Sequence, residues 1–350
     1  MGYTHLILQE RIQLQVMLQQ GKSRREIARV LNRSASTISR EVKRQASASL
    51  YDAAAAQAQA TRGGEKARRP EKMADLHLTA IVEEKLREKW SPEQIAGRLP
   101  LDFPQEPKMR ISPETIYRYI YAQQERGHNL LFCLRQGHSG PRKRRHKKCK
   151  YQRIKDLKGI DQRPGEVDQR SRLGDWESDT LCGPSREGAG IATHVERKTR
   201  YLVAAKLDHG KAAEYNQKTI QAFRALQGVP VHTMTVDHGM EFASFKELEK
   251  SLPTAVYFAQ PYHAWERGLN ENTNGLLRQY FPKGKSLSDI SQEELNEVEK
   301  QLNHRPRKCL GYRTPAEALA QAMGLKCCTC KLNPRDRTFA FQKVHEPDKM

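Results

Sequence analysis

The order of secondary-structure segments in the carboxyl half constrains the fold more than any other feature of this sequence. From about residue 170, three short segments with the alternation of β-strands follow one another, at 176–182, 190–196 and 201–207. A helical pattern then covers 212–227. After it, strand and helix patterns alternate, over 229–236, 242–252, 255–258 and 264–280. Three consecutive strands followed by this alternation predict an α/β domain.

This order is the one expected of a ribonuclease-H-like sheet over residues 169–325, although periodicity alone allows several other α/β folds. In that fold three acids would converge: Asp179 within the first strand, Asp237 at the end of the fourth, and Glu271 in the middle of a helix. Three clustered carboxylates repel one another without a cation, and their hard oxygens suit Mg²⁺ or Mn²⁺ rather than zinc. Two such ions, about 3.5–4 Å apart, stabilise the attacking and leaving oxygens of phosphoryl transfer.

Other interpretations of these acids remain open at the level of spacing. An aspartate at the end of a strand is more often a turn or cap residue than a ligand, and Glu271 could pair with Arg267 four residues earlier on a solvated helix face. Asp175 and Glu177 share the face of Asp179 because side chains alternate along a strand. The spacing therefore does not select one metal site.

The first 47 residues carry a helix-turn-helix pattern. A helix over 6–20, with Leu8, Ile12 and Met17 at helical spacing, ends at Gly21. Ser23 predicts the cap of a second helix, with Glu26 completing a capping box. Asn32 suits the left-handed turn, and a helix over 36–44 follows, which Ile38 and Val42 hold in place.

The outer face of that last helix predicts contact with DNA. Short hydroxyls and long cations suit base edges and phosphates in a major groove. Here the exposed positions are Ser36, Thr37, Ser39, Arg40, Lys43 and Arg44. The alternative is a helical hairpin with a polar outer face.

The middle of the chain predicts a linker over 48–75, a second helix-turn-helix-like region over 76–135 and a basic linker over 136–168. In the second region, helices start at Ser91 and Ser112, and Tyr117 and Arg118 could reach phosphate. The basic linker contains the densest charge run, from which we expect backbone contacts by Arg142, Lys143, Arg144 and Arg145. A tail over 326–350 contains Cys327, Cys328 and Cys330, which lack a partner pair at zinc-site spacing.

The distribution of charge favours a polyanionic partner. The chain has 61 Lys and Arg against 41 Asp and Glu, a net charge of +20, and residues 1–150 hold 30 of the basic and 15 of the acidic side chains. No stretch approaches the roughly 20 apolar residues of a membrane span, and no signal peptide is recognisable, so membrane spanning and secretion are not expected. Seven cysteines form no disulfide framework, which favours the cytoplasm.

Several segments of the carboxyl half form a long and specific pattern. They include Trp-Glu-Ser-Asp at 176–179, Asp-His-Gly-Met-Glu-Phe at 237–242, Trp-Glu-Arg-Gly at 265–268 and Asn-Glu-Asn-Thr-Asn-Gly at 270–275, and Asn-His-Arg-Pro-Arg at 303–307 with Leu-Gly-Tyr-Arg-Thr-Pro at 310–315 closes them. This half resembles the catalytic domain of the DDE transposases and retroviral integrases, specifically the insertion-sequence-thirty family of bacterial transposases. The N-terminal helix-turn-helix also matches, so the resemblance spans nearly the whole chain.

The resemblance implies a transposase that binds the terminal inverted repeats of an insertion sequence, cleaves DNA strands and transfers the freed 3′-hydroxyl to new DNA. It places the catalytic and metal-binding acids at Asp179, Asp237 and Glu271, with two Mg²⁺ ions per active site, for which Mn²⁺ can substitute. The implied partners are double-stranded DNA, both terminal repeats and target, and further copies of the chain on that DNA. The implied location is the bacterial cytoplasm, in association with the nucleoid.

Asn274 and Arg278 lie three and seven residues after Glu271, where they would orient that acid or contact DNA, and Trp265 is expected in the core. The family pattern usually has Gly at Ser178 and Asn at His238. The alternative function is a sequence-specific DNA-binding regulator with a catalytically silent integrase-like domain; the presence of all three acids favours the enzyme.

Overall fold

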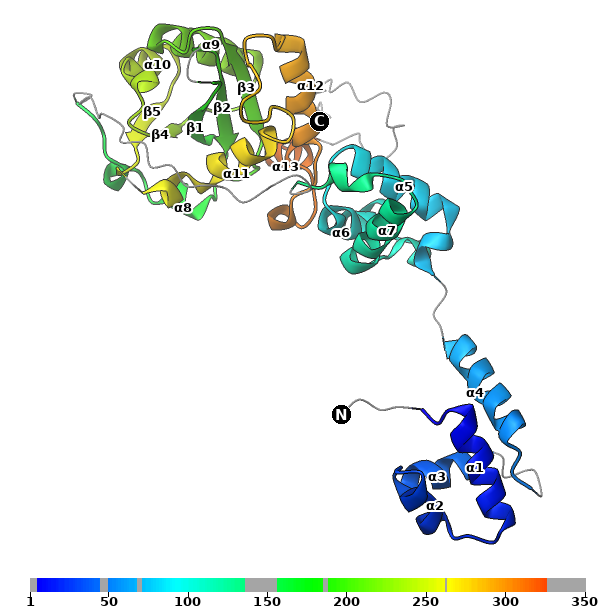
Figure 1. The fold of residues 1–350 in the computed structure, drawn as a ribbon. Helices are drawn as coiled ribbons and strands as arrows, with labels where there is room; N and C mark the ends of the chain where they lie inside the picture. The colour runs from blue at the N-terminus through cyan, green and yellow to red at the C-terminus, as the bar shows by residue number, and fades with distance from the viewer. Residues whose placement is uncertain are drawn as a thin grey trace, which may run out of the picture. The chain divides into compact units, whose positions relative to one another are not determined.

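The computed structural model describes residues 5–44, 50–67, 71–135, 156–184, 188–261 and 263–325. The chain divides into two units, Met1–Ala74 and Asp75–Met350, whose elements are labelled in Figure 1. The expected phosphate-contacting run Arg142–Arg145 and the cluster Cys327–Cys330 lie outside the described residues. Within the described part of the chain, no helix combines the length and apolarity needed to cross a bilayer.

The N-terminal unit is built from four helices, with bends where the sequence provides for them. Gly21 and Asn32 adopt left-handed backbone angles, with φ of 74° and 51°. Ser23 and Ser34 accept hydrogen bonds from backbone N–H groups in the first turns of the second and third helices. The helices are α1 (Leu8–Gln19), α2 (Arg24–Val30), α3 (Ala35–Lys43) and α4 (Ala53–Ala67).

The packing of α1 differs from the expectation. Leu8 and Ile12 are 45% and 48% exposed, whereas Arg11 is buried. The buried guanidinium donates to Glu41 Oε1 at 2.7 Å and to Gln57 Oε1 at 2.5 Å, so Arg11 shares the inward face of α1 with Leu14 because its charge has partners there. The N-terminus of α2 also differs, since the carboxylate of Glu26 pairs with Lys22 and does not complete a capping box.

Helix α4 belongs to this unit. Tyr51, Ala53 and Ala56 are buried in one cluster with Leu14, Ile27 and Ile38. The unit therefore continues through α4 to Ala74, beyond the 47 residues that the sequence assigns to the N-terminal domain.

The second unit begins with a bundle of three helices, α5 (Leu76–Arg87), α6 (Pro92–Asp102) and α7 (Pro113–Glu125). Ser91 and Gln94 form a complete capping box on α6, and Ser112 accepts from Thr115 N at the start of α7. The apolar faces of the three helices are buried, with Leu78, Val82, Leu86, Ile95, Leu99, Ile116 and Ile120 each at most 3% exposed. Two short 3₁₀ helices belong to this region, η2 (Pro107–Met109) and η3 (Leu130–Cys133), whereas η1 (Lys72–Ala74) ends the N-terminal unit.

A five-stranded sheet follows, in the order β3-β2-β1-β4-β5. Its strands are β1 (Asp175–Cys182), β2 (Gly190–Glu196), β3 (Leu202–Leu207), β4 (Thr233–Val236) and β5 (Ala255–Phe258). The first three pair antiparallel, whereas β4 pairs parallel with both β1 and β5. The N-terminal helix-turn-helix and the α/β domain built on this mixed sheet confirm the predicted fold class.

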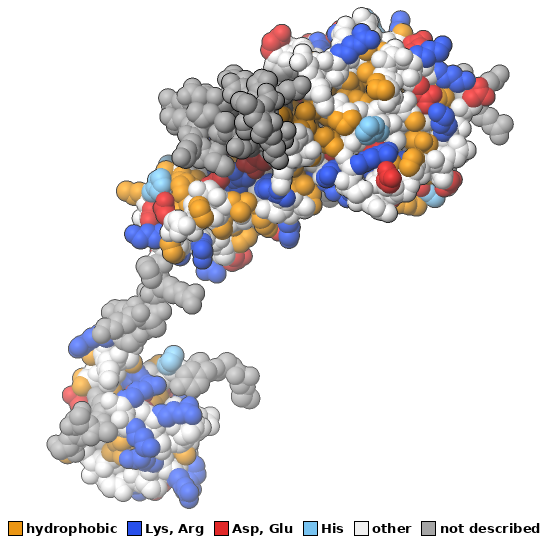
Figure 2. Space-filling view, turned by 180° about the vertical axis from the view of Figure 1, so that it is seen from behind, with side chains coloured by type: hydrophobic (Ala, Val, Ile, Leu, Met, Phe, Trp, Pro, Cys, Tyr) orange, Lys and Arg blue, Asp and Glu red, His pale blue; other side chains and the backbone are white. Residues whose placement is uncertain are grey.

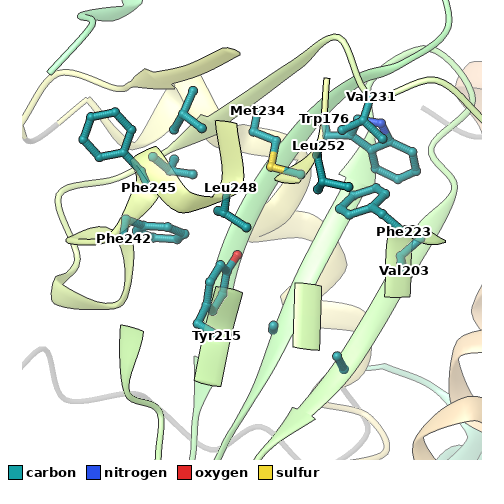
Figure 3. Close-up of a cluster of buried hydrophobic side chains, with 14 of the residues drawn as sticks. Trp176, Val203, Tyr215, Phe223, Val231, Met234, Phe242, Phe245, Leu248 and Leu252 are labelled. Carbon is teal, nitrogen blue, oxygen red and sulfur yellow. The ribbon is translucent and has the colours of Figure 1, made fainter. Parts of the chain in front are cut away.

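Helices cover both faces of the sheet. On one face, α9 (Ala212–Ala225) and α10 (Phe245–Ser251) bury a cluster that includes Trp176, Tyr215, Phe223 and Phe242 (Figure 3). On the other, α11 (Gly268–Leu277) and α12 (Gln292–Asn303) pack Leu276, Phe281, Leu295 and Leu302 against Ile191 and Val195. The remaining elements are η4 (Ile160–Gln162), α8 (Glu166–Gln169), η5 (Met240–Phe242), η6 (Ala264–Arg267), η7 (Lys308–Leu310) and α13 (Pro315–Ala322).

Candidate active site

Two of the three predicted acids lie side by side where β4 ends: Asp179 within β1, and Asp237 directly after β4. Strands β1 and β4 run parallel, with Glu177 opposite Thr235. Two residues further along each chain are Asp179 and Asp237, which therefore lie at the same edge of the sheet. Asp179 accepts from Thr180 N at 2.9 Å, and Asp237 accepts from Gly239 N at 2.8 Å, so local backbone fixes both carboxylates.

A guanidinium bridges these two carboxylates. Arg267 Nη1 lies 3.3 Å from Asp179 Oδ1, and Arg267 Nη2 lies 3.0 Å from Asp237 Oδ2. Burial raises the pKa of Asp179, the positive charge of Arg267 opposes the rise, and the negative charge of Asp237 adds to it. The sequence suggested Arg267 only as a partner of Glu271; the structure pairs it with the two aspartates instead.

Asn274 supports the site from α11. Its Nδ2 donates to Asp179 Oδ2 at 3.0 Å, while its Oδ1 accepts from Thr193 Oγ1 at 3.1 Å. The amide is thereby fixed from β2 and orients the carboxylate of Asp179, whereas the sequence suggested that Asn274 would orient Glu271 or contact DNA. Thr193 was not singled out from the sequence, because a threonine in a buried strand carries no distinguishing pattern.

Glu271 is not gathered with the two aspartates. Its side chain is exposed on α11, one turn before Asn274. Across the described ranges, no three His, Cys, Asp or Glu side chains lie close enough to hold a metal ion together. The role of Glu271 as third ligand stays a prediction.

The donor set at the sheet edge nevertheless suits a divalent cation. Asp179 and Asp237 supply hard carboxylate oxygens, and a positive group already lies between them. Glu241 adds negative charge nearby: burial raises its pKa, and the charges of both aspartates raise it further. Glu241 is a neighbour that the sequence interpretation missed.

The two rival acids on β1 have structural partners. Asp175 accepts from Arg172 at 2.9 and 3.0 Å and from Thr233 Oγ1 at 2.7 Å. Glu177 pairs with the buried Arg197 and accepts from the backbone N–H groups of Leu269 and Asn270 at the start of α11. The carboxylates of Asp175 and Glu177 thus bind these structural partners and do not pair with Arg267 beside Asp237.

The two departures from the family pattern are compatible with this site. Ser178 points toward the core, where its Oγ lies 2.8 Å from His194 Nδ1. Burial lowers the pKa of His194 to about 3, so the ring is neutral. The ring of His238 packs against Phe258, with 5.7 Å between centroids.

The N-terminal candidates for DNA contact lie on and near one helix face. Ser36, Arg40 and Lys43 are exposed, whereas Thr37 and Ser39 are half-buried. The hydroxyls of Ser36 and Thr37 lie 2.9 and 2.8 Å from Ser34 Oγ, and exposed Arg44 pairs with Glu41 at 3.1 Å. Lys and Arg side chains are spread over the face of this unit seen in Figure 2.

The remaining candidates differ in exposure. Arg118 is largely exposed and pairs with Glu114 at 3.3 Å. Arg278 is half-buried and donates to the carbonyl oxygen of Cys182 at 2.7 Å, which links α11 to the end of β1. Trp265 is not in the core as expected: it is 71% exposed and stacks on His263, because η6 turns Arg267, not Trp265, inward to the two aspartates.

Two family models match the chain. The family model described as a helix-turn-helix domain matches residues 2–45, and that of the integrase core domain matches residues 170–264. Integrase core domains generally use divalent metal ions.

Curated relatives match over almost the full length. The transposase InsI of insertion sequence element IS30A from Escherichia coli is 41% identical, covering 92% of this chain and 85% of its own. The transposase of element IS4351 from Bacteroides fragilis is 38% identical, covering 91% and 96%, and that of element IS1086 from Cupriavidus metallidurans is 37% identical, covering 96% and 97%. The chain therefore belongs to the transposases of the IS30 family.

Proposed function

We propose that this transposase binds the terminal inverted repeats of its element and catalyses metal-dependent strand cleavage and 3′-hydroxyl transfer, with Asp179, Asp237 and Glu271 as the acids. The observation that carries the proposal is the convergence of Asp179, within β1, and Asp237, directly after β4, on one cation, Arg267. Family membership makes phosphoryl transfer on DNA the reaction that such a pair would serve.

The proposed cofactor is Mg²⁺, with Mn²⁺ as a substitute and two ions per site. When bound, divalent ions neutralise charge on the attacking and leaving oxygens of phosphoryl transfer. The chain's own residues prepare the site: Asn274 orients Asp179, and Thr193 orients Asn274. Glu271, on the same helix, is the proposed third ligand.

The proposed partners are terminal-repeat and target DNA, with further copies of the chain assembled on them at the nucleoid. End recognition is assigned to the exposed face of α3, including Arg40 and Lys43, with a contribution from Arg118. The run from Arg142 to Arg145 would add phosphate contacts without adding sequence choice.

The test is cleavage and strand transfer by the purified full chain with labelled terminal-repeat DNA and Mg²⁺. Asp179→Asn, Asp237→Asn and Glu271→Gln should each remove nearly all cleavage and leave end binding in place, because each acid supplies charge that the others cannot replace. The control is Glu297→Gln, an exposed glutamate on α12, which should cleave as the parent does. Cleavage within a few-fold of the parent in any of the three variants would remove that acid from the proposed site.

The same assay distinguishes the transposase from the alternative, a DNA-binding regulator without catalysis. The exposed position of Glu271, apart from the two aspartates, favours that alternative. A regulator would bind terminal repeats over random DNA and cleave neither with Mg²⁺ nor with Mn²⁺. Selective binding together with cleavage that stops in EDTA would exclude it.

A further inference from the structure

Residues 303–317 include the segments that close the family pattern, and their contacts lead to the edge of the sheet and to the three-helix bundle. The segment starts from the edge strand of the sheet, where Asn303 accepts from Leu202 N through Oδ1 and donates to Leu202 O through Nδ2, both at 2.8 Å. Two hydrogen bonds to one strand residue, made by a buried amide, fix the start of the segment to β3.

From this anchor the segment reaches helix α6 of the three-helix bundle. Arg305 Nε donates to Gln94 Oε1 at 2.8 Å, and Gln94 Nε2 donates to Pro306 O at 2.8 Å. Arg98 then forms a two-pronged ion pair with Glu317, at 2.6 and 2.7 Å, with only 15% and 19% of the two side chains exposed. Planar pairs of this kind specify geometry as well as adding energy.

Shape complementarity fixes the same interface. A Cβ on Gly97 would lie 2.4 Å from three ring atoms of Tyr312, so only glycine lets this ring lie across α6. Glycine is unfavourable in a helix interior. Its presence in the middle of α6 is therefore explained by the close approach of Tyr312.

The bundle also contacts the residues that directly follow α11, the helix that carries Asn274. Lys89 Nζ donates to the carbonyl oxygen of Gln279 at 3.0 Å and lies 3.9 Å from the ring centroid of Tyr280, just beyond the end of α11. Arg305 Nη1 donates to Gln279 Oε1 at 2.7 Å. The bundle and α11, which carries Asn274, are thus held by shared contacts.

We propose that this interface, α6 with residues 305–317, is a clamp that holds the bundle in one position on the catalytic domain and so sets which phosphate of a bound end reaches Asp179 and Asp237. The clamp uses α6 and leaves Tyr117, Arg118 and Tyr121 of α7 exposed for DNA. Gly97, Arg98, Tyr312 and Glu317 are positioning residues in this account. The inference rests on the proposed function, because it presupposes cleavage at a defined phosphate.

The first test maps the cut phosphate at nucleotide resolution with the full chain and terminal-repeat DNA. Gly97→Ala and Arg98→Gln should lower cleavage at the parental phosphate by about 10- to 100-fold and produce cuts at neighbouring phosphates, since a displacement of about 1 Å costs rates of that order. The control is Leu101→Ala, which changes a half-exposed side chain on the same helix and should cut as the parent does. The double variant Arg98→Gln with Glu317→Gln should lose less than the two single losses combined, because the pair acts as a unit.

If both Gly97→Ala and Arg98→Gln lower the rate of cleavage but still cut only at the parental phosphate, the interface has a merely structural role and the proposal is overturned. A second measurement does not depend on cleavage: hydroxyl-radical footprints of the end, taken in an Asp179→Asn background. In that background the proposal predicts a sharp outer boundary of the protected DNA, and Gly97→Ala should make this boundary less sharp. A boundary that Gly97→Ala leaves unchanged would also overturn the proposal. Failure of the parental chain to cut at all would count against the proposed function, and the footprint would still decide on the clamp.

Discussion

Replacement of Glu177 by alanine should destabilise the catalytic domain more than any surface change. The Glu177 carboxylate is buried, pairs with the buried guanidinium of Arg197 and accepts from the N–H groups of Leu269 and Asn270 at 3.0 and 3.3 Å. Burial raises the pKa of Glu177, and the charge of Arg197 opposes that rise. One carboxylate thus balances a buried cation and holds the start of α11.

The expected loss follows from these partners. Removal of one member of a buried ion pair costs about 3–5 kcal/mol, because the other charge is left uncompensated. The N–H of buried Asn270 also loses its acceptor, at about 1–3 kcal/mol. We therefore expect Glu177→Ala to lower the free energy of unfolding by about 5 kcal/mol, a large part of the total for a domain.

Urea unfolding measures this loss through the fluorescence of Trp176, which is fully buried beside Glu177. Changing Trp90 and Trp265 to Phe isolates that signal. The control is Glu166→Ala, whose largely exposed carboxylate pairs with Arg172 and should contribute at most about 1 kcal/mol. A loss below about 1 kcal/mol in Glu177→Ala would refute the reasoning.

A second variant separates the ion pair from the contact with α11. Glu177→Met combined with Arg197→Met removes both charges, and should recover a large part of the loss seen when Glu177 alone is replaced. The backbone N–H groups of Leu269 and Asn270 stay without an acceptor in this pair. If the double variant is no more stable than Glu177→Ala, the cost lies in the α11 contact and the charge argument fails.

Three further outcomes are expected. Ser178→Gly leaves His194 Nδ1 without its partner, so urea unfolding should show a loss of about 1–3 kcal/mol, while cleavage stays within a few-fold of the parent because the hydroxyl faces away from Asp179. Burial raises the pKa of Glu299 from 4.5 to about 7, so the folded chain binds that proton more tightly than the unfolded chain does. The free energy of unfolding should therefore fall as pH rises through that interval, and Glu299→Gln should flatten the fall in unfolding curves taken across it. A last variant replaces the four residues of the basic run by alanine: Arg142, Lys143, Arg144 and Arg145. It should reduce the slope of log affinity against log salt by about 2–4 in magnitude, for specific and random DNA alike. An unchanged slope would show that the run is a spacer without phosphate contacts.

The sequence predicted the strands and the sheet edge because those signals are local. Alternation along 176–182 and 190–196 marks buried strands, and the strand order brings the end of β4 beside the middle of β1. The bridging role of Arg267 could not be predicted in this way, since it depends on how η6 meets the sheet. Helical spacing likewise placed Glu271 and Asn274 on one face, but only Asn274 turns to Asp179.

Errors in the N-terminal unit have a similar cause. Apolar residues at helical spacing in α1 were expected inside, yet Leu8 and Ile12 are half-exposed and Arg11 is buried. The burial of Arg11 depends on Glu41 and Gln57, which lie 30 and 46 residues away in the sequence. Periodicity identifies the helix, whereas its orientation follows from partners that only the fold brings close.

The arrangement of β1 explains why three acids at alternate positions do not compete for one role. All three side chains leave the same face of the strand, but each meets a different element: Asp175 meets Arg172 and β4, Glu177 meets α11, and Asp179 meets Asp237 through Arg267. Asp175 holds β1 against β4, and Glu177 holds the start of α11 against β1, so both help to position Asp179. A change at Glu177 should therefore disturb catalysis through the position of α11, whereas a change at Asp179 should remove catalysis and leave the fold in place.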